Sequence, residues 1–271
     1  MTAVAGSHVV VTGGSSGIGL ATALECARRG ARVSLIARDR DRLDEAASGM
    51  RPWASVRTAS ADVSDTASLS SAIASLTDAH GPGDVLVTSA GASRPGRFWE
   101  LEDRDFLRLM TVNYFGTLNA VREVLPSMMQ RRRGSIVGVS SAAALVGVYG
   151  YSAYGASKFA VRGLLESLRG EVKPYGIHVG CAVPPDVDTP MLWAEDEVKP
   201  VETAAISGGI RALEPQKVAV SIVDGIERER FWIVPDWRTA ALVRLAGAAW
   251  EPLQAGFDRV VRRVQRQHGQ G

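Results

Sequence analysis

A series of short apolar runs, separated by segments of helical length, constrains the fold most strongly. The runs are apolar nearly throughout, which is typical of strands buried on both faces of a parallel sheet. They span residues 8–12, 32–37, 55–63, 84–90, 135–141, 177–183 and 231–234. Helices are expected at 17–29, 64–77, 103–133 and 152–173. The alternation predicts right-handed βαβ units in an α/β fold with a doubly wound, seven-stranded parallel sheet.

The chain has 271 residues, and no linker or internal repeat divides it. This length accommodates one large α/β domain, which we assign to 1–237. The stretch 185–214 shows no periodic pattern and is expected to be an irregular lid over a substrate, with a plain surface insertion as the alternative. Residues 238–271 form a basic tail of helical character.

Bulk properties exclude several classes of function. A net charge of +2 gives no overall attraction to nucleic acid. The two distant cysteines suggest no disulfide framework and favour a reducing, cytoplasmic location. The N-terminus lacks the features of a signal peptide, and no apolar stretch is long enough to span a membrane. The four histidines form no metal-binding motif, so we expect no metal site.

The tail alternates apolar residues with six arginines, against two acidic residues. A basic amphipathic helix can lie on an anionic membrane surface. Equally, such a helix can cover its own domain or a partner subunit. We favour the second role for 238–250 and peripheral membrane contact for 257–266.

A glycine-rich turn, "VTGGSSGIGLA" at 11–21, joins the first strand to the first helix. Glycines let a dinucleotide pyrophosphate approach the backbone, where the free N–H groups of the helix start meet its charge. Leu20 stands where a P-loop would have lysine, which excludes that motif. The predicted cofactor contacts in this turn are Gly13, Ser15, Ser16, Gly17, Ile18 and Gly19.

The second strand ends in "ARDRDRL", where NAD-preferring enzymes usually place an acidic residue. Arg38 and Arg42 instead favour the 2′-phosphate of NADP(H). The alternative is a solvated charge run at a helix start that also contains Asp39. At the end of the third strand, Asp62 is interpreted either as an acceptor for the adenine amino group or as part of a helix cap.

Tyr154 and Lys158 lie four residues apart, so they share one helix face, and only small residues separate them. A tyrosine with its usual pKa of about 10 is a weak acid-base catalyst, and a nearby ammonium lowers that pKa. We therefore expect Lys158 to lower the pKa of Tyr154 and to bind the ribose of the cofactor. Ser141 is expected to hold a substrate oxygen, and Asn113 to hold a water that relays protons to Lys158. Each residue alone also has an ordinary structural role.

These pieces together resemble the short-chain dehydrogenase/reductases: "TGGSSGIG", "ADV", "VNYFG", Ser141 and "YGASK". The resemblance covers about 8–235. It implies a Rossmann-type domain that binds NAD(P)(H), a catalytic set of Asn113, Ser141, Tyr154 and Lys158, and a homo-oligomer. It also implies cofactor contacts from Val63, Ala90 and Gly91.

A narrower resemblance is to the 3-ketodihydrosphingosine reductases, which share Pro184-Pro185-Asp186 where most short-chain reductases have Pro-Gly. It implies that Val187 and Thr189 contact the nicotinamide carboxamide, and that NADPH reduces the 3-keto group of a long-chain lipid. Alternatives are a 3-oxoacyl thioester, a steroid-like ketone, or an NADP(H)-binding sensor without catalysis. The usual Asn-Asn-Ala-Gly is "TSAG" here, which is expected to weaken a hydrogen-bond network unless Ser89 replaces part of it.

Overall fold

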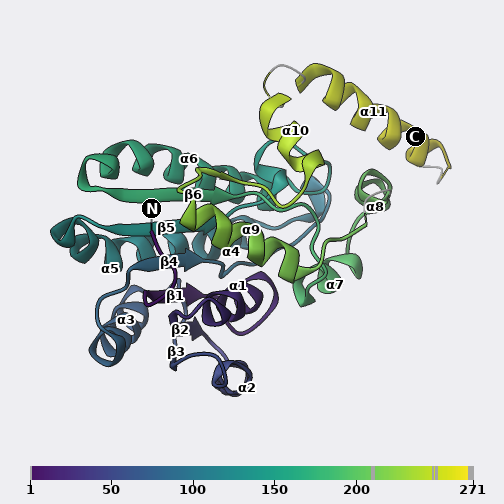
Figure 1. The fold of residues 1–271 in the computed structure, drawn as a ribbon. Helices are drawn as coiled ribbons and strands as arrows, with labels where there is room; N and C mark the ends of the chain where they lie inside the picture. Colours follow the sequence, from purple (N-terminus) through teal and green to yellow (C-terminus); the bar gives the residue numbers. More distant parts are fainter. Residues whose placement is uncertain (1, 209–210, 246, 248–249, 268–271) are drawn as a thin grey trace.

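A computed structural model describes residues 2–208, 211–245, 247 and 250–267. Its centre is a seven-stranded parallel sheet in the order β3-β2-β1-β4-β5-β6-β7 (Figure 1), which confirms the predicted doubly wound α/β fold. The strands are β1 (His8–Thr12), β2 (Arg32–Ala37), β3 (Val56–Ser60), β4 (Val85–Thr88), β5 (Gly134–Val139), β6 (Ile177–Ala182) and β7 (Trp232–Ile233).

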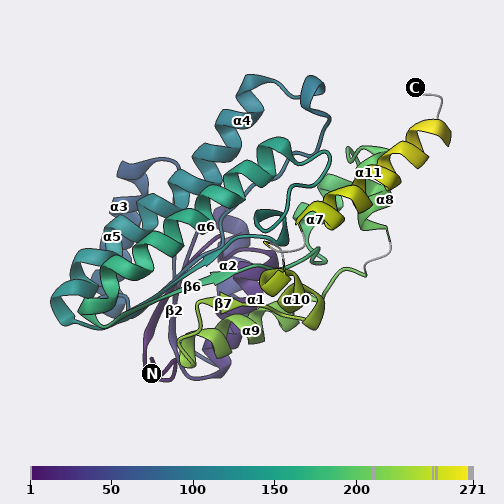
Figure 2. The same cartoon turned by 90° about the horizontal axis from the view of Figure 1, so that it is seen from above.

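Helices cover both faces of the sheet, as Figure 2 shows. On one face α1 (Gly17–Arg28), α2 (Arg40–Met50) and α9 (Pro215–Glu227) pack into one apolar cluster with the strands. On the other face a second cluster involves α3 (Thr66–His80), α5 (Gly116–Arg131) and α6 (Ser152–Val172). The central strands β1, β4, β5 and β6 are therefore shielded on both sides, which explains their largely apolar sequences, whereas the edge strand β3 is partly exposed.

The expected helix at 103–133 contains an irregularity that the sequence pattern did not predict. It consists of α4 (Asp103–Leu109), a π-helical turn η2 (Met110–Phe115) and α5. The π turn carries Asn113, and such turns are frequent at functional sites. The helices α2 and α9 were not among the predicted helices. Five strands, β3 to β7, end one to three residues earlier than predicted.

The stretch 185–214 was expected to be irregular but contains two short helices, α7 (Pro190–Asp196) and α8 (Val201–Ser207). Its residues 209–210 lie outside the described part. Glu202 of α8 is fully buried and accepts hydrogen bonds from Arg97 at 3.1 Å and from Tyr149 at 3.2 Å. Thr203 donates to the Tyr149 carbonyl. These contacts attach α8 to the loops before α4 and before α6.

The basic tail forms α10 (Trp237–Leu245) and α11 (Trp250–Gln267), and its residues 246, 248–249 and 268–271 lie outside the described part. The helix α11 lies against α8 (Figures 1 and 2), with Val264 buried and Arg262 and Arg263 exposed. The apolar side of α11 thus packs on its own chain, and membrane contact stays a prediction. None of the described helices is long and apolar enough to cross a bilayer.

Two histidines form a buried polar network between β1, β2 and α3. His8 contacts the Gly81 carbonyl at 2.7 Å and the Ser34 hydroxyl at 2.8 Å. His80 contacts the same hydroxyl at 3.2 Å and that of Ser55 at 3.0 Å. Burial lowers the pKa of both rings, that of His80 to about 4, so both are neutral in the folded protein near pH 7.

We predict that Glu202→Gln lowers the free energy of unfolding by about 2 kcal/mol, because Arg97 loses a buried charged partner. Urea denaturation measures this change. Glu100→Gln is the matched control, since Glu100 also pairs with Arg97 but is exposed, and it is expected to cost clearly less stability than Glu202→Gln. Equal losses in the two variants would contradict this account of the α8 attachment.

We also predict that stability falls as the pH is lowered from about 6.5 toward 4. In that range unfolded His80 binds a proton that the folded ring excludes, so it contributes a slope of up to about 1.4 kcal/mol per pH unit, and the lowered pKa of His8 acts in the same direction. His80→Gln should flatten the dependence of the unfolding free energy on pH. Parallel profiles for the variant and the natural protein would show that this network does not control acid sensitivity.

Candidate active site

A cavity of about 960 Å³ lies at the carboxyl ends of the strands. Loops that follow six of the strands, β1 to β6, converge on it, as expected for a doubly wound sheet. Of the predicted site residues, all but Gly19 and Asn113 line it. The lining residues are Gly13, Ser15, Ser16, Gly17, Ile18, Arg38, Arg42, Asp62, Val63, Ala90, Gly91, Ser141, Tyr154, Lys158, Val187 and Thr189.

The glycines of the β1–α1 turn are required first by the packing of the turn itself. Gly13 has φ of +70°, and a Cβ there would lie 2.6 Å from the backbone nitrogen of Ala90. A Cβ on Gly19 would lie 2.2 Å from the Gly13 carbonyl oxygen. Gly17 has φ of +54°, and a Cβ there would lie 3.1 Å from the Thr189 Cγ2. The turn therefore lies against the loops after β4 and β6, and its backbone borders the cavity.

The start of α1 has the properties of an anion site. Its N-cap residue, Ser16, makes no side-chain cap, and the first turn of the helix carries no acidic residue. N–H groups at such a helix start attract a phosphate, and the dipole of the helix adds to that attraction. Together with the side-chain-free wall at Gly13 and Gly17, this start fits the pyrophosphate of a dinucleotide.

Two arginines at the end of β2 line the same side of the cavity. The side chain of Arg38 is 79% exposed and lies 3.9 Å from a carboxylate oxygen of Asp62. Arg42 lies 3.5 Å from Asp39, which also caps α2. Both guanidinium groups are accessible for a further anion, which is the arrangement that a ribose 2′-phosphate requires.

The two interpretations of Asp62 can now be compared. The cap of α3 is Asp65, not Asp62. Asp62 accepts hydrogen bonds from the backbone and the hydroxyl of Ser64 through one oxygen and borders the cavity. Burial raises its pKa, but the Ser64 bonds and Arg38 outweigh burial and lower it. Asp62 is thus an ionised acceptor at the edge of the cavity, and its contact with an adenine stays a prediction.

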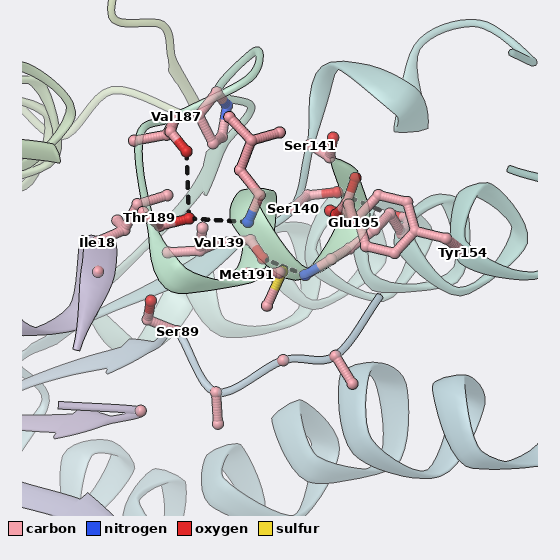
Figure 3. Close-up of a pocket in the computed structure, with 18 of the residues that line it drawn as sticks. Ile18, Ser89, Val139, Ser140, Ser141, Tyr154, Val187, Thr189, Met191 and Glu195 are labelled. Carbon is pink, nitrogen blue, oxygen red and sulfur yellow. Dashed lines mark hydrogen bonds between the residues drawn. The ribbon is translucent and has the colours of Figure 1, made fainter. Parts of the chain in front are cut away.

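The predicted catalytic side chains meet at the inner part of the cavity, around α6. Ser141 follows β5 and caps the short helical turn that begins at Ala142. Figure 3 shows Ser141 and Tyr154 side by side. The Nζ of Lys158 lies 5.8 Å from the centre of the Tyr154 ring and donates to the Val139 carbonyl at 3.0 Å. The helical spacing of Tyr154 and Lys158 therefore brings them to one face, as predicted.

The expected lowering of the Tyr154 pKa does not appear in this arrangement. Burial and the nearby Glu195 carboxylate raise the pKa of Tyr154, and a hydrogen bond with Ser141 opposes them only in part. Burial also lowers the pKa of Lys158 to about 8. Both pKa values are shifted toward the neutral form because each group loses more hydration than its partners restore, although Lys158 still carries its proton near pH 7.

Asn113 is buried and holds two segments together. Its amide nitrogen donates to the Ala92 carbonyl at 2.9 Å and to the Ser157 hydroxyl at 2.8 Å, and its oxygen accepts from the Ala92 nitrogen at 2.8 Å. A Cβ on Gly91 would lie 3.2 Å from that oxygen and 3.5 Å from Lys158. Asn113 thus anchors the loop after β4 against α6 beside the lysine, while its role in a proton relay stays a prediction.

The sequence "TSAG", which replaces the usual Asn-Asn-Ala-Gly, leaves one buried polar group without a hydrogen bond. The Thr88 hydroxyl is buried and has no hydrogen-bond partner among the described residues. Ser89 joins the network through its backbone, which donates to the Thr12 carbonyl at 3.1 Å, and its side chain borders the cavity (Figure 3). The predicted weakening is therefore present at Thr88.

Sequence reasoning missed two acidic residues of the cavity. Glu195 of α7 is buried and accepts a hydrogen bond from the Tyr151 hydroxyl at 2.5 Å. Asp186, which the Pro-Pro-Asp motif singled out only as a family feature, also lines the cavity. Burial raises the pKa of both carboxyl groups. Their position within an apparently irregular stretch gave no local signal of this role.

The outer wall of the cavity is largely apolar. It combines residues from the loop after β5 and from α7 with others from α8, α10 and α11. The apolar residues of this wall are Val146, Val148, Met191, Leu192, Ile206, Leu242 and Phe257. The 185–214 stretch and the tail therefore both border the cavity, and the first does so as expected of a lid.

Comparison with known proteins agrees with this architecture. The sequence model described as "short chain dehydrogenase" matches residues 7–199. The 3-ketodihydrosphingosine reductase of Bos taurus is 44% identical over 227 residues, which are 82% of this chain and 68% of the relative. The protein of that name from Dictyostelium discoideum is 40% identical over 250 residues, 85% of this chain and 75% of the relative.

Solved structures give the same fold. A short-chain dehydrogenase/reductase from Burkholderia phymatum in complex with NAD has a TM-score of 0.83 and 26% identity, covering 93% of this chain and 97% of that one. A short-chain dehydrogenase from Sphingobium yanoikuyae in complex with NADPH has a TM-score of 0.78 and 29% identity, covering 92% and 95%. The chain belongs to the short-chain dehydrogenase/reductase family of NAD(P)-binding oxidoreductases.

Proposed function

We propose that this protein uses NADPH to reduce the 3-keto group of 3-ketodihydrosphingosine, or of a similar long-chain lipid, to a secondary alcohol. The observation that carries the proposal is a cavity with Ser141, Tyr154 and Lys158 at its inner end and an apolar outer wall. Such a cavity can hold a hydrocarbon chain while its polar end meets the proton donor. The relatives named 3-ketodihydrosphingosine reductase support the substrate class.

The side chains divide the chemistry of the reduction among them. NADPH, when bound, supplies the hydride that the carbonyl carbon receives. Tyr154 donates its phenolic proton to the carbonyl oxygen, and its raised pKa keeps it protonated at neutral pH. Ser141 donates a hydrogen bond to the same oxygen and holds it beside the phenol. Together these two groups neutralise the charge that develops on oxygen.

Lys158 supports the tyrosine rather than touching the carbonyl. Its pKa of about 8 lies near physiological pH, so the ammonium can lose or regain a proton at small cost. We infer that it stabilises the phenolate left after proton transfer and binds ribose hydroxyls of the cofactor. Asn113 fixes the loop beside this ammonium through its bonds to Ala92.

The preference for NADPH rests on the arginines at the end of β2. Arg38 and Arg42 would pair with the 2′-phosphate, while Gly13, Gly17 and the start of α1 would hold the pyrophosphate. Asp62 and Val63 would border the adenine, Ala90 and Gly91 its ribose, and Val187 and Thr189 the carboxamide of the nicotinamide. Homo-oligomerisation and peripheral membrane contact through α11 remain predictions.

The direct test is the rate of NADPH oxidation by the purified protein with 3-ketodihydrosphingosine in detergent. A 3-oxoacyl thioester and a steroid ketone are assayed in parallel, and NADH replaces NADPH in a second series. Rapid, NADPH-dependent reduction of the sphingoid ketone supports the proposal. If only another ketone is reduced, the proposed reaction mechanism stands and the proposed substrate is rejected. If the protein binds NADPH but reduces no ketone, it is a sensor and not a reductase.

We predict that Tyr154→Phe abolishes detectable turnover and leaves NADPH binding unchanged. The variant loses only the hydroxyl that donates the proton, a contribution of roughly 10²–10⁴-fold for general acid catalysis. Steady-state kinetics and fluorescence titration of NADPH measure the two effects. Tyr149→Phe is the control, because Tyr149 lies in the turn just before α6 and contacts Glu202. Full activity of Tyr154→Phe would reject the proposed mechanism.

We also predict that Arg38→Gln raises the KM for NADPH about tenfold and leaves the KM for NADH nearly unchanged. The lost interaction is a charge-assisted hydrogen bond between Arg38 and the 2′-phosphate. Because Arg38 is exposed to solvent, the free energy of this bond is expected at the lower end of the range for charged hydrogen bonds. Arg40→Gln provides the control, since Arg40 is exposed nearby without bordering the cavity. An unchanged ratio of the two KM values would reject this role of Arg38.

A further inference from the structure

A buried carboxyl group lies next to the proposed proton donor. Glu195 is 8% exposed and borders the cavity, and Figure 3 shows its side chain beside Tyr154 and Ser141. The Tyr151 hydroxyl donates a hydrogen bond to it at 2.5 Å, and the Tyr151 and Tyr154 rings are 5.4 Å apart. Tyr151 thus orients the carboxyl group, whose charge acts on the neighbouring Tyr154.

Among the described residues this carboxyl group forms no salt bridge, although Lys158 and Lys199 lie near enough to interact with its charge. Lys199, at the end of the same helical segment, pairs with Asp196 at 2.8 Å instead. The second acidic group of the cavity, Asp186, adds negative potential at Glu195. The buried Ser93 hydroxyl lies near Glu195 and favours its charged form, but it forms no hydrogen bond of good geometry with any described residue.

A purely structural role does not account for this arrangement. A hydrogen bond to Tyr151 needs only a neutral acceptor, such as a glutamine. Burying a carboxyl group costs several kcal/mol unless a cation or several donors compensate it, and two such groups at one cavity increase the cost. A cationic ligand that enters the cavity would offset this cost, because it forms an ion pair with the buried carboxylate.

The proposed substrate carries such a cation at the required place. A 3-keto sphingoid base has its amino group on carbon 2, one bond from the carbonyl carbon. When Tyr154 and Ser141 hold the carbonyl oxygen, the ammonium must therefore lie beside these two residues. The runner-up substrates, a 3-oxoacyl thioester and a steroid ketone, carry no ammonium at this position.

We propose that Glu195, oriented by Tyr151 and assisted by Asp186, binds the ammonium group adjacent to the ketone and selects 2-amino ketones over neutral ketones. This inference rests on the proposed function and deepens it. Glu195 is a specificity residue here, because it contacts the substrate without taking part in proton or hydride transfer. A charge-assisted hydrogen bond from an ammonium to a buried carboxylate is among the stronger polar contacts.

The test compares two substrates in the natural protein and in Glu195→Gln. One is 3-ketodihydrosphingosine, and the other is its counterpart without the amino group, with the same chain. We expect the variant to lose roughly 10- to 100-fold in kcat/KM for the amino ketone, mainly through KM, because a charged contact is lost. For the deaminated ketone we expect a change of less than about threefold.

Glu197→Gln is the matched control, because Glu197 follows α7 and is exposed. Glu197→Gln should leave kcat/KM unchanged for both substrates. Tyr151→Phe serves as a second variant that keeps the carboxyl group and removes its orienting donor. It should lower kcat/KM for the amino ketone less than Glu195→Gln does, and it should likewise leave kcat/KM for the deaminated ketone nearly unchanged. This variant also tests the proposal if Glu195→Gln does not fold.

A binding measurement separates this inference from the proposed function. The saturated product, dihydrosphingosine, and the corresponding diol without the amine are titrated into the NADPH-free protein by calorimetry. Weaker binding of the amine alone in Glu195→Gln supports the inference even if neither ketone is reduced. Equal losses for amine and diol, or for both ketones, would overturn it and reduce Glu195 to a structural partner of Tyr151.

Discussion

The turn after β1 lies so close to the chain after β4 that position 13 has no room for a side chain. This contact joins the two neighbouring strands at which the order of the sheet reverses. From β1 the chain passes to α1 on one face, and from β4 it passes toward α4 and α5 on the other. The two crossovers diverge, so a crevice opens between them. Every group proposed to act on the cofactor or the substrate is arranged around that crevice.

The cavity differs in electrical character from one end to the other. Arg38, Arg42 and the start of α1 make one end attractive to anions. Glu195 and Asp186 make the inner end acidic, where Tyr154 and Lys158 also lie. Such a distribution of charge can orient an anionic cofactor and a cationic substrate in the cavity by electrostatic attraction alone. The neutral walls then contribute affinity through burial of hydrocarbon, which has little directional preference.

The features that the sequence predicted are those that neighbouring residues define. The parallel sheet followed from apolar runs, and the glycine turn and the Tyr154–Lys158 pair followed from short fixed spacings. Asn113 was identified as a residue unsuited to a helix, although the π turn around it became visible only in the structure. Glu195 could not be identified, because its importance comes from Tyr151 and Tyr154, which lie more than forty residues away. The pKa of Tyr154 was misjudged for a related reason: burial is a property of the whole cavity and not of the helix face.

The apolar wall contributed by Leu242 and Phe257 belongs to α10 and α11, which follow the last strand of the sheet. One part of the wall that shapes the space for a lipid is therefore encoded after all the groups proposed for chemistry, although Val146 and Met191 lie among them in the sequence. A change in α11 can alter which molecules fit without disturbing the sheet, the glycine turn or Tyr154. The fold thereby permits new substrate ranges to evolve by substitution near the end of the chain, while the inherited reaction is conserved.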